Sequence, residues 1–303
     1  MKKLISTALV FAAGFVLSGA TFSEQMAEAD KLYKAKKYKE AAAAYDDASL
    51  ETEKAAERIK ARFRSFESMA KTRSGETLAT AENLLYDEAG LTPDQVVKLT
   101  KYIVNRGNGE QRRKALESGL KRKDFSELYR SRILLLAINN SGSFNSEKYV
   151  DEILTMTSPD PEAKAHAFGH RANICLWVKK DYPAAIDYIG KCLEIKQLSR
   201  DDRQFFTLVK ARAHLRMRQI QQAESCYLHA ISCGGSRSFL NAAYRELMVV
   251  YARSGQAAKI EPLLHEAAKN KRLSRKQREE FSNIIAEIAK RRAARAQQNG
   301  ESK

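Results

Sequence analysis

The sequence predicts an all-α fold built from repeated helix pairs, and three observations lead to this prediction. The 303 residues include only 14 glycines and 5 prolines to interrupt helices. Small and apolar residues recur at helical spacing, and this pattern itself repeats about every 36 residues. No alternating run of β-branched residues has the length of a strand. A composition that is 44% apolar and 8% aromatic excludes a collagen, a disulfide-stapled miniprotein and a polytopic membrane protein.

Residues 1–20 have the order of a secretory signal peptide. Two lysines precede an apolar run from Leu4 to Leu17, and small residues follow it. About 14 apolar residues span about 21 Å as a helix, which is short of a membrane core, so an uncleaved anchor is the weaker alternative. No cysteine precedes Cys175 to carry a lipid. We therefore expect cleavage before Thr21, export to the periplasm or beyond, and no transmembrane span in the mature chain.

The cysteines all lie in the C-terminal half: Cys175, Cys192, Cys226 and Cys233. An even number in an exported protein allows one or two disulfides, and the alternative is four unpaired, buried thiols. No C-x-x-C spacing occurs, which argues against a redox pair or a zinc ribbon. Cys226 and Cys233 are expected about 10.5 Å apart along one helix, too far for a disulfide between them.

The first helix pair is expected in residues 21–51, which read Ala29-x2-Leu32-Tyr33-x4-Tyr38-x2-Ala41-x3-Tyr45-x2-Ala48. The position of Ala41 recurs at Ala185, Ala223 and Ile260. The later steps are 38 and 37 residues, and the first gap of 144 residues leaves room for three less regular copies. We therefore predict seven units: one in 21–51, three degenerate ones in 52–160, and three in 161–272.

These copies resemble the tetratricopeptide repeat (TPR) family, whose units are helix pairs with small and aromatic residues at such intervals. The resemblance implies a right-handed α-solenoid in an exported bacterial protein. It is partial, because the glycine usual in the first helix is replaced by Ala29, Asn173, Ala211 and Met248. Residues 52–160 match only in apolar periodicity.

Helix boundaries are readable at several places. In the degenerate stretch, helices are expected over 52–70, 76–89, 92–105, 110–121, 126–139 and 146–155. Helix starts are expected at Thr92-Pro-Asp-Gln95, Asp160-Pro161, Ser199 and Ser274-Arg-Lys-Gln277. A long amphipathic helix in 273–296 is expected to cap the solenoid, and 297–303 to form a disordered tail.

No catalytic motif appears in the sequence. His166 and His170 have the i, i+4 spacing that can place two imidazoles on one metal, with Cys175 nearby. The pair lacks the H-E-x-x-H arrangement and a third ligand, so we favour a solvated or packing pair and expect no metal or cofactor. A nucleophile elbow and a phosphate-cradling glycine loop are also missing. The sequence therefore predicts a protein that is not an enzyme, and a metal-dependent enzyme is the remote alternative.

The TPR resemblance implies that the first helix of each unit lines a partner-binding groove. In units five to seven it places these residues there: His170, Ile174, Trp177, Leu208, Arg212, Arg216, Arg245, Val249 and Arg253. Four arginines beside apolar residues resemble the carboxylate clamp of the family, which suits a protein or peptide with an acidic segment. The alternatives are that the arginines form a solvated face and that Trp177 packs between units.

The formal net charge is +16, and basic residues cluster in 112–114, 121–123 and 269–303. These clusters make binding to anionic envelope polymers or a membrane surface the rival function. An exported protein meets such surfaces before nucleic acid, so we expect no nucleic-acid partner. The sequence as a whole predicts a non-catalytic scaffold of the bacterial envelope.

Overall fold

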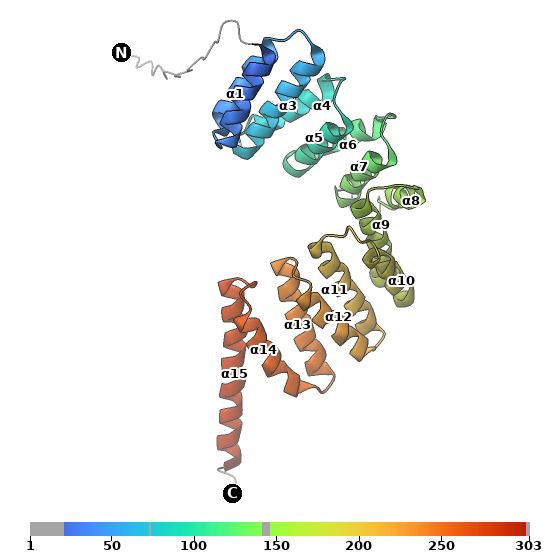
Figure 1. Cartoon of the computed structure of the whole chain (residues 1–303). Coiled ribbons are helices and arrows are strands. Elements are labelled where there is room, and N and C mark those ends of the chain that lie inside the picture. The colour runs from blue at the N-terminus through green and yellow to red at the C-terminus, as the bar shows by residue number, and fades with distance from the viewer. Residues whose placement is uncertain (1–20, 73, 141–145, 301–303) are drawn as a thin grey trace, which may run out of the picture. The chain divides into compact units, whose positions relative to one another are not determined.

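The fold is described from a computed structural model, which describes residues 21–72, 74–140 and 146–300. Over these ranges the chain forms fifteen α-helices and no strand, and consecutive helices pack in pairs (Figure 1). The predicted all-α fold of helix pairs is therefore confirmed. The expected signal peptide, 1–20, lies outside the described residues. Within the described ranges, none of the helices has the length and apolar character needed to cross a membrane.

The chain divides into two compact units, and the first extends to Lys121. Its helices are α1 (Phe22–Lys34), α2 (Tyr38–Leu50), α3 (Ala55–Thr72), α4 (Thr77–Asp87), α5 (Pro93–Arg106) and α6 (Gly109–Lys121). Thr21 and Glu24 form a capping box at the start of α1, which satisfies backbone amides that have no partner within the helix. Thr92 and Gln95 cap α5 in the same way, as predicted.

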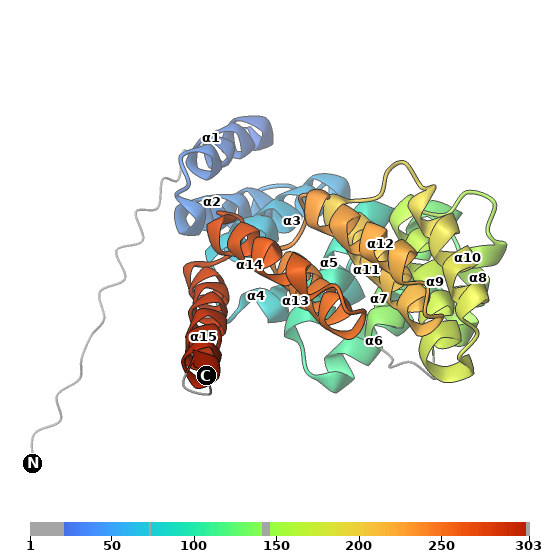
Figure 2. The same ribbon diagram turned by 90° about the horizontal axis from the view of Figure 1, so that it is seen from below.

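The second unit begins at Arg122. Its helices are α7 (Glu127–Asn140), α8 (Glu147–Thr155), α9 (Pro161–Asn173), α10 (Tyr182–Leu193), α11 (Arg200–Arg216), α12 (Ile220–Ser232), α13 (Arg237–Arg253), α14 (Ile260–Lys269) and α15 (Arg275–Gly300). Figure 2 shows α13 and α14 beside α11 and α12. A π-helix, η1 (Ile174–Lys179), continues α9, and a short 3-10 helix, η2 (Ala257–Lys259), precedes α14.

The repeated alanines are buried in the cores of their hairpins. Ala41, Ala185 and Ala223 are fully buried, and a methyl side chain there lets the helix backbones approach closely. One turn later, Tyr45 and Tyr227 are fully buried as well. Ile260, the fourth of these positions, is only half-buried at the start of α14. This hairpin therefore departs from the others at its second helix.

The turn inside each of these hairpins has one left-handed residue. Lys36, Lys180, Arg218 and Gly255 all have φ between 57° and 75°, and they follow one another by the same 144, 38 and 37 residues as the small positions. After Lys36, Arg218 and Gly255 the next amide donates to the carbonyl five residues earlier, at 2.9–3.0 Å. This Schellman-type bond ends the first helix and turns the chain into the second.

The hairpin of α9 and α10 contains one extra residue before its turn. Here the amide of Asp181 donates at 2.9 Å to the carbonyl of Cys175, six residues earlier rather than five. The π-helix η1 accommodates the insertion, because a π turn holds one residue more than an α turn. Positions of α9, counted back from the left-handed residue of the turn, are consequently shifted by one residue, or about 100° around the helix, relative to the same counts in α1, α11 and α13.

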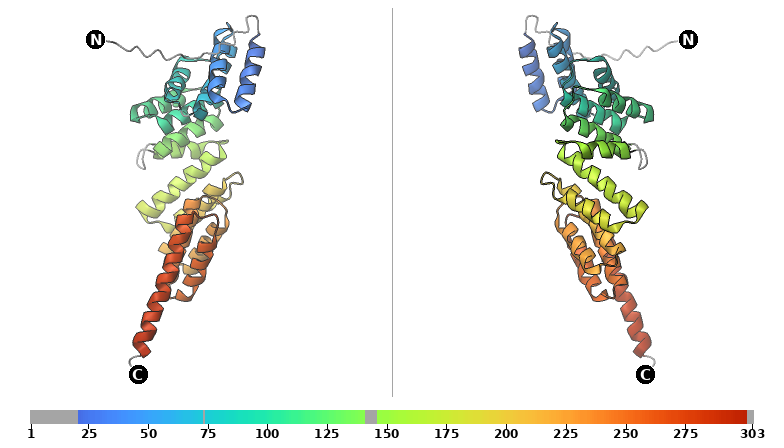
Figure 3. Two further views of the ribbon diagram at one scale, coloured as in Figure 1. Left: turned by 90° about the vertical axis from the view of Figure 1, so that its left-hand side faces the viewer. Right: turned by 90° about the vertical axis from the view of Figure 1, so that its right-hand side faces the viewer.

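The last helix, α15, packs on α14 and extends past it (Figures 1 and 3). Phe281 of α15 is buried in a core that it shares with residues of α13 and α14, and Ser274 and Gln277 form the predicted reciprocal cap. The helix continues to Gly300, whereas the sequence predicted a disordered tail from 297. No proline follows Ala-rich residues 293–296 to stop it. The rest of the predicted tail, 301–303, lies outside the described residues.

All four cysteines are free, which matches the alternative of unpaired thiols. Cys175 and Cys192 are buried, and Cys226 and Cys233 are half-buried. The thiol of Cys192 donates to the carbonyl of Ala165 at 3.2 Å, and burial raises its pKa to about 12. Cys192 therefore serves as a small core residue rather than a reactive thiol.

The left-handed turns predict a stabilising substitution. Arg218→Gly should raise the free energy of unfolding by about 0.5–1 kcal/mol, because glycine avoids the left-handed penalty of a side chain. Thermal unfolding followed by circular dichroism should show Tm rising by about 1–3 °C. Arg218→Ala is the control, since it removes the same side chain but keeps a Cβ. Equal melting of the two variants would show that the turn is not strained.

Candidate functional site

The residues predicted to line a groove lie on the first helices of three consecutive hairpins, in α9 with η1, in α11 and in α13. Their exposure differs widely. Leu208 is only 1% exposed and belongs to the core shared with α12 and α13. Its predicted place in a groove is therefore wrong, because this position of α11 faces the next hairpin rather than solvent.

Two of the four arginines are already paired with carboxylates. Arg212 forms a bidentate contact with Glu246 of α13: its Nε donates to Oε2 at 2.9 Å and its Nη2 donates to Oε1 at 2.6 Å. Glu246 also accepts from the hydroxyl of Tyr227 at 3.0 Å. Arg245 pairs with Glu280 of α15 at 2.5 Å. A clamp of four free arginines, as the sequence suggested, is therefore absent from this surface.

The contact between Arg212 and Glu246 has a counterpart in the first unit with the charges reversed. Asp30 and Arg212 both lie six residues before the left-handed turn residue of their hairpins. Asp30 of α1 accepts from Arg64 of α3 at 2.8 Å, and it also accepts from the buried Tyr45 hydroxyl. In both places a buried tyrosine and an ion pair join the first helices of consecutive hairpins. These charges therefore stabilise the stacking of repeats.

The exposed part of the predicted surface centres on Trp177. This side chain is 51% exposed and its neighbour Val178 is 63% exposed, and both lie in η1. The guanidinium of Arg216, from α11, lies 5.4 Å from the centre of the Trp177 ring, a distance suited to cation–π attraction. We call Trp177, Val178 and Arg216 the Trp177 patch. It combines an aromatic face, an aliphatic side chain and a cation.

On the next first helix, α13, Val249 is 40% exposed and Arg253 is exposed. Within the described ranges, neither Arg216 nor Arg253 forms an ion pair, so these two arginines keep their charge available. Ile174 is half-buried at the start of η1. His170 is also half-buried, and its Nε2 lies 2.7 Å from the Ser146 hydroxyl. Burial lowers the pKa of His170, which favours a neutral imidazole at this position.

Several cations of the basic clusters are engaged by their own neighbours. In 112–114, Arg113 pairs with Glu117, Arg112 donates to the carbonyl of Gly107, and Lys114 lies over the Tyr86 ring. In α15, arginines 291 and 292 pair with Glu287 and Glu261. For Arg113, Arg291 and Arg292 the fold thus supplies acidic partners from adjacent turns and helices, so part of the positive charge expected from the sequence is paired.

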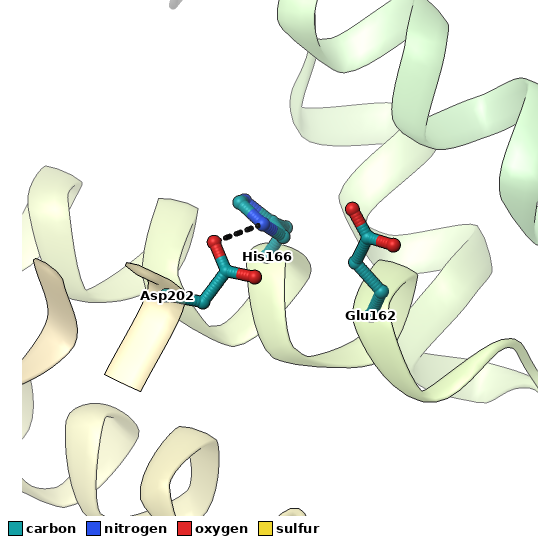
Figure 4. Close-up of side chains that lie close together, drawn as sticks. All are labelled: Glu162, His166 and Asp202. Atoms are coloured by element: carbon teal, nitrogen blue, oxygen red, sulfur yellow. Dashed lines mark hydrogen bonds and ion pairs between the residues drawn. The ribbon is translucent and has the colours of Figure 1, made fainter. Parts of the chain in front are cut away.

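His166 and His170 do not converge on one point. His170 contacts Ser146, whereas the Nε2 of His166 lies 3.1 Å from a carboxylate oxygen of Asp202 in α11. Glu162, one turn earlier on α9, completes a group whose ligand atoms all lie within 4.8 Å of one another (Figure 4). The sequence analysis paired His166 with His170 rather than with Asp202. The repeat period of about 36 residues could have indicated Asp202, which follows His166 by 36 positions.

Comparison with known proteins identifies the fold. No model of a known protein family matches the sequence, and the curated proteins also give no match. The chain is similar to the crystal structure of the C-terminal part of a TPR repeat-containing protein from Cytophaga hutchinsonii. The TM-score is 0.54 at 15% identity, over 83% of this chain and 97% of that one. The chain therefore has the helical-hairpin fold of TPR proteins.

Two further solved structures are less similar. A signal-transduction ATPase with a tetratricopeptide repeat sensor, from Pyrococcus horikoshii, gives a TM-score of 0.49 at 16% identity, covering 84% of this chain and 41% of that one. A complex of the TPR2AB domain of yeast Sti1 with pHSP90 gives 0.29 at 15% identity, covering 88% and 98%. The fold assignment rests on the first structure.

The pair of Arg212 and Glu246 generates a charge-reversal prediction. Glu246→Arg alone should lower the free energy of unfolding by about 1.5–3 kcal/mol, because it removes hydrogen bonds to a charged group and sets two cations together. Adding Arg212→Glu should restore at least half of the loss, since Asp30 and Arg64 show that the reversed pair fits the repeat. Urea unfolding measures both.

The exposed pair of Arg275 and Glu279 is the matched control for this experiment. Its reversal should change the free energy of unfolding by less than about 0.5 kcal/mol. A double variant of Arg212 and Glu246 no more stable than Glu246→Arg alone would contradict the stated role of this ion pair.

Proposed function

We propose that the protein is a non-catalytic scaffold that binds a protein or peptide segment on the first helices of its C-terminal hairpins. The observation that carries the proposal is the Trp177 patch, where an exposed tryptophan lies beneath an arginine that has no acidic partner within the described chain. Tryptophan and arginine are the residues that most often dominate binding energy at protein interfaces.

The chemistry of the patch specifies the segment. An apolar side chain of the partner would pack on Trp177 and Val178, and an acidic group would pair with Arg216. Arg253, on the next first helix, offers a second cation for a longer acidic segment. Because α9, α11 and α13 are held by packed hairpins, binding would order few protein side chains, which lowers its entropic cost.

We also propose that the protein acts in the bacterial envelope, after removal of residues 1–20. The support is the charged, apolar and small-residue order of that segment. The segment can be tested by fusing residues 1–25 to alkaline phosphatase, which is active only after export. Enzyme activity that disappears when Leu4–Leu17 is interrupted by two arginines would agree with export, and activity lacking in the unmodified fusion would refute it.

The binding proposal predicts a loss of partner with two substitutions. The chain from Thr21, immobilised, should retain a defined protein from an envelope extract. A folded variant with Trp177→Ala and Arg216→Ala should bind that protein at least about tenfold more weakly, which is the effect of losing one interface hot spot. Affinity of the recovered partner is then measured by calorimetry with purified components.

Leu228→Ala is the matched control, because Leu228 is also an exposed apolar residue, 44% exposed, but lies on a second helix, α12. It should bind as the unmodified chain does. Equal loss in both variants would place the interface elsewhere. Recovery of only anionic lipid or wall polymer, removed by salt, would replace the proposal with the basic-surface function.

A further inference from the structure

Glu162, His166 and Asp202 bring three metal-binding side chains together from two consecutive hairpins. We propose that they form a binding site for a divalent transition-metal ion, with zinc as the best-matched ion. Figure 4 shows His166 and Asp202 facing each other, with Glu162 on the same helix as His166. The site is separate from the Trp177 patch, and the proposal does not depend on the proposed function.

The distances fit one metal ion after small side-chain movements. Ligand atoms on a tetrahedral zinc ion lie about 3.3 Å apart, because each bond is about 2.0–2.2 Å. The Nε2 of His166 is already 3.1 Å from Asp202 Oδ1. All three ligand atoms lie within 4.8 Å of one another, and Glu162 is exposed, so a change of its rotamer can close the remaining gap.

The imidazole of His166 is held in orientation by its packing. Its ring contacts Phe206 of α11 edge to face, with centroids 5.7 Å apart. Phe206 occupies this position because Gly169 has no side chain: a Cβ there would lie 2.3 Å from the Phe206 ring. The histidine therefore presents Nε2 to the carboxylate without needing a metal to order it, which favours binding.

The two carboxylates differ in their surroundings. The second oxygen of Asp202 accepts from the Ser199 hydroxyl at 2.6 Å, the kind of outer contact that orients a metal-binding carboxylate. The carboxylate of Glu162 has no hydrogen bond or ion pair within the described residues, so it is available as a ligand.

The ligand types select the class of ion. One imidazole with two carboxylates suits zinc and its neighbours in the transition series. Magnesium and calcium prefer oxygen ligands alone and more of them. Three protein ligands leave the fourth tetrahedral position for water or for a group from a partner. An ion at this place would connect α9 to α11 and so hold two first helices together.

Calorimetry on the full mature chain, without an affinity tag, tests the site. We expect one zinc ion to bind per chain and magnesium not to bind. Glu162→Gln should weaken zinc binding at least about tenfold, since even outer-shell losses cost 10–100-fold. This variant should fold normally, because Glu162 is exposed and its carboxylate forms no hydrogen bond or ion pair within the described residues. His166→Gln should abolish binding.

Two controls make the result specific. His265→Ala removes an exposed histidine of α14 and should leave zinc affinity unchanged. Cobalt in place of zinc should give a spectrum without the thiolate charge-transfer band, because the proposed ligands include no cysteine. A thiolate band, unchanged affinity in Glu162→Gln, or no zinc binding by the unmodified chain would each overturn the proposal. In the last case the two carboxylates would be favourable first-turn residues only.

Discussion

The close packing of two helices within a hairpin, seen at Ala41, Ala185 and Ala223, is the constraint on which the rest of the structure depends. Alanine at 41, 185 and 223 allows that packing, and the left-handed residue five positions earlier reverses the chain so that it occurs. A hairpin formed in this way still has an apolar face, which only the next hairpin can bury. The order of the helices, the buried tyrosines and the alignment of first helices all follow from this packing.

The stacking of hairpins also determines which basic side chains form ion pairs within the chain and which stay unpaired. Lys and Arg outnumber Asp and Glu by 53 to 37, and some arginines on the first helices pair with a carboxylate of a neighbouring hairpin, as Arg64 does with Asp30 and Arg212 with Glu246. Arg64 and Arg212 show that the repeat accepts either polarity of the pair at one position. Among the cations without an acidic partner in the described chain, Arg216 is the one that lies over an exposed aromatic ring, that of Trp177. Net charge alone overstates the basic surface that a partner would meet.

The fold could be predicted from the sequence because its determinants are local and repeated. Small residues at fixed spacing, caps such as Thr92 with Gln95, and the scarcity of helix breakers all lie within one hairpin. The candidate site depends instead on contacts between hairpins. Leu208 faces the core because α12 and α13 cover it, and Arg212 is engaged because α13 brings Glu246 to it. Asp202 reaches His166 across one whole repeat, a pairing that periodicity can indicate only once the register of α9 is known.

The π-helix before Lys180 has a consequence for the molecule as a repeating structure. The single inserted residue is accommodated within η1, and the helices on either side still pack as they do elsewhere in the chain. Counted back from the left-handed residue, the side chains of α9 are shifted by one residue relative to those of α1, α11 and α13, while the helix pairs continue to pack. This shift places different side chains on the surface of α9 and η1 than the same count from the turn places on α11 and α13. Among the described residues η1 is the one π-helix, and the exposed Trp177 and Val178 lie in it.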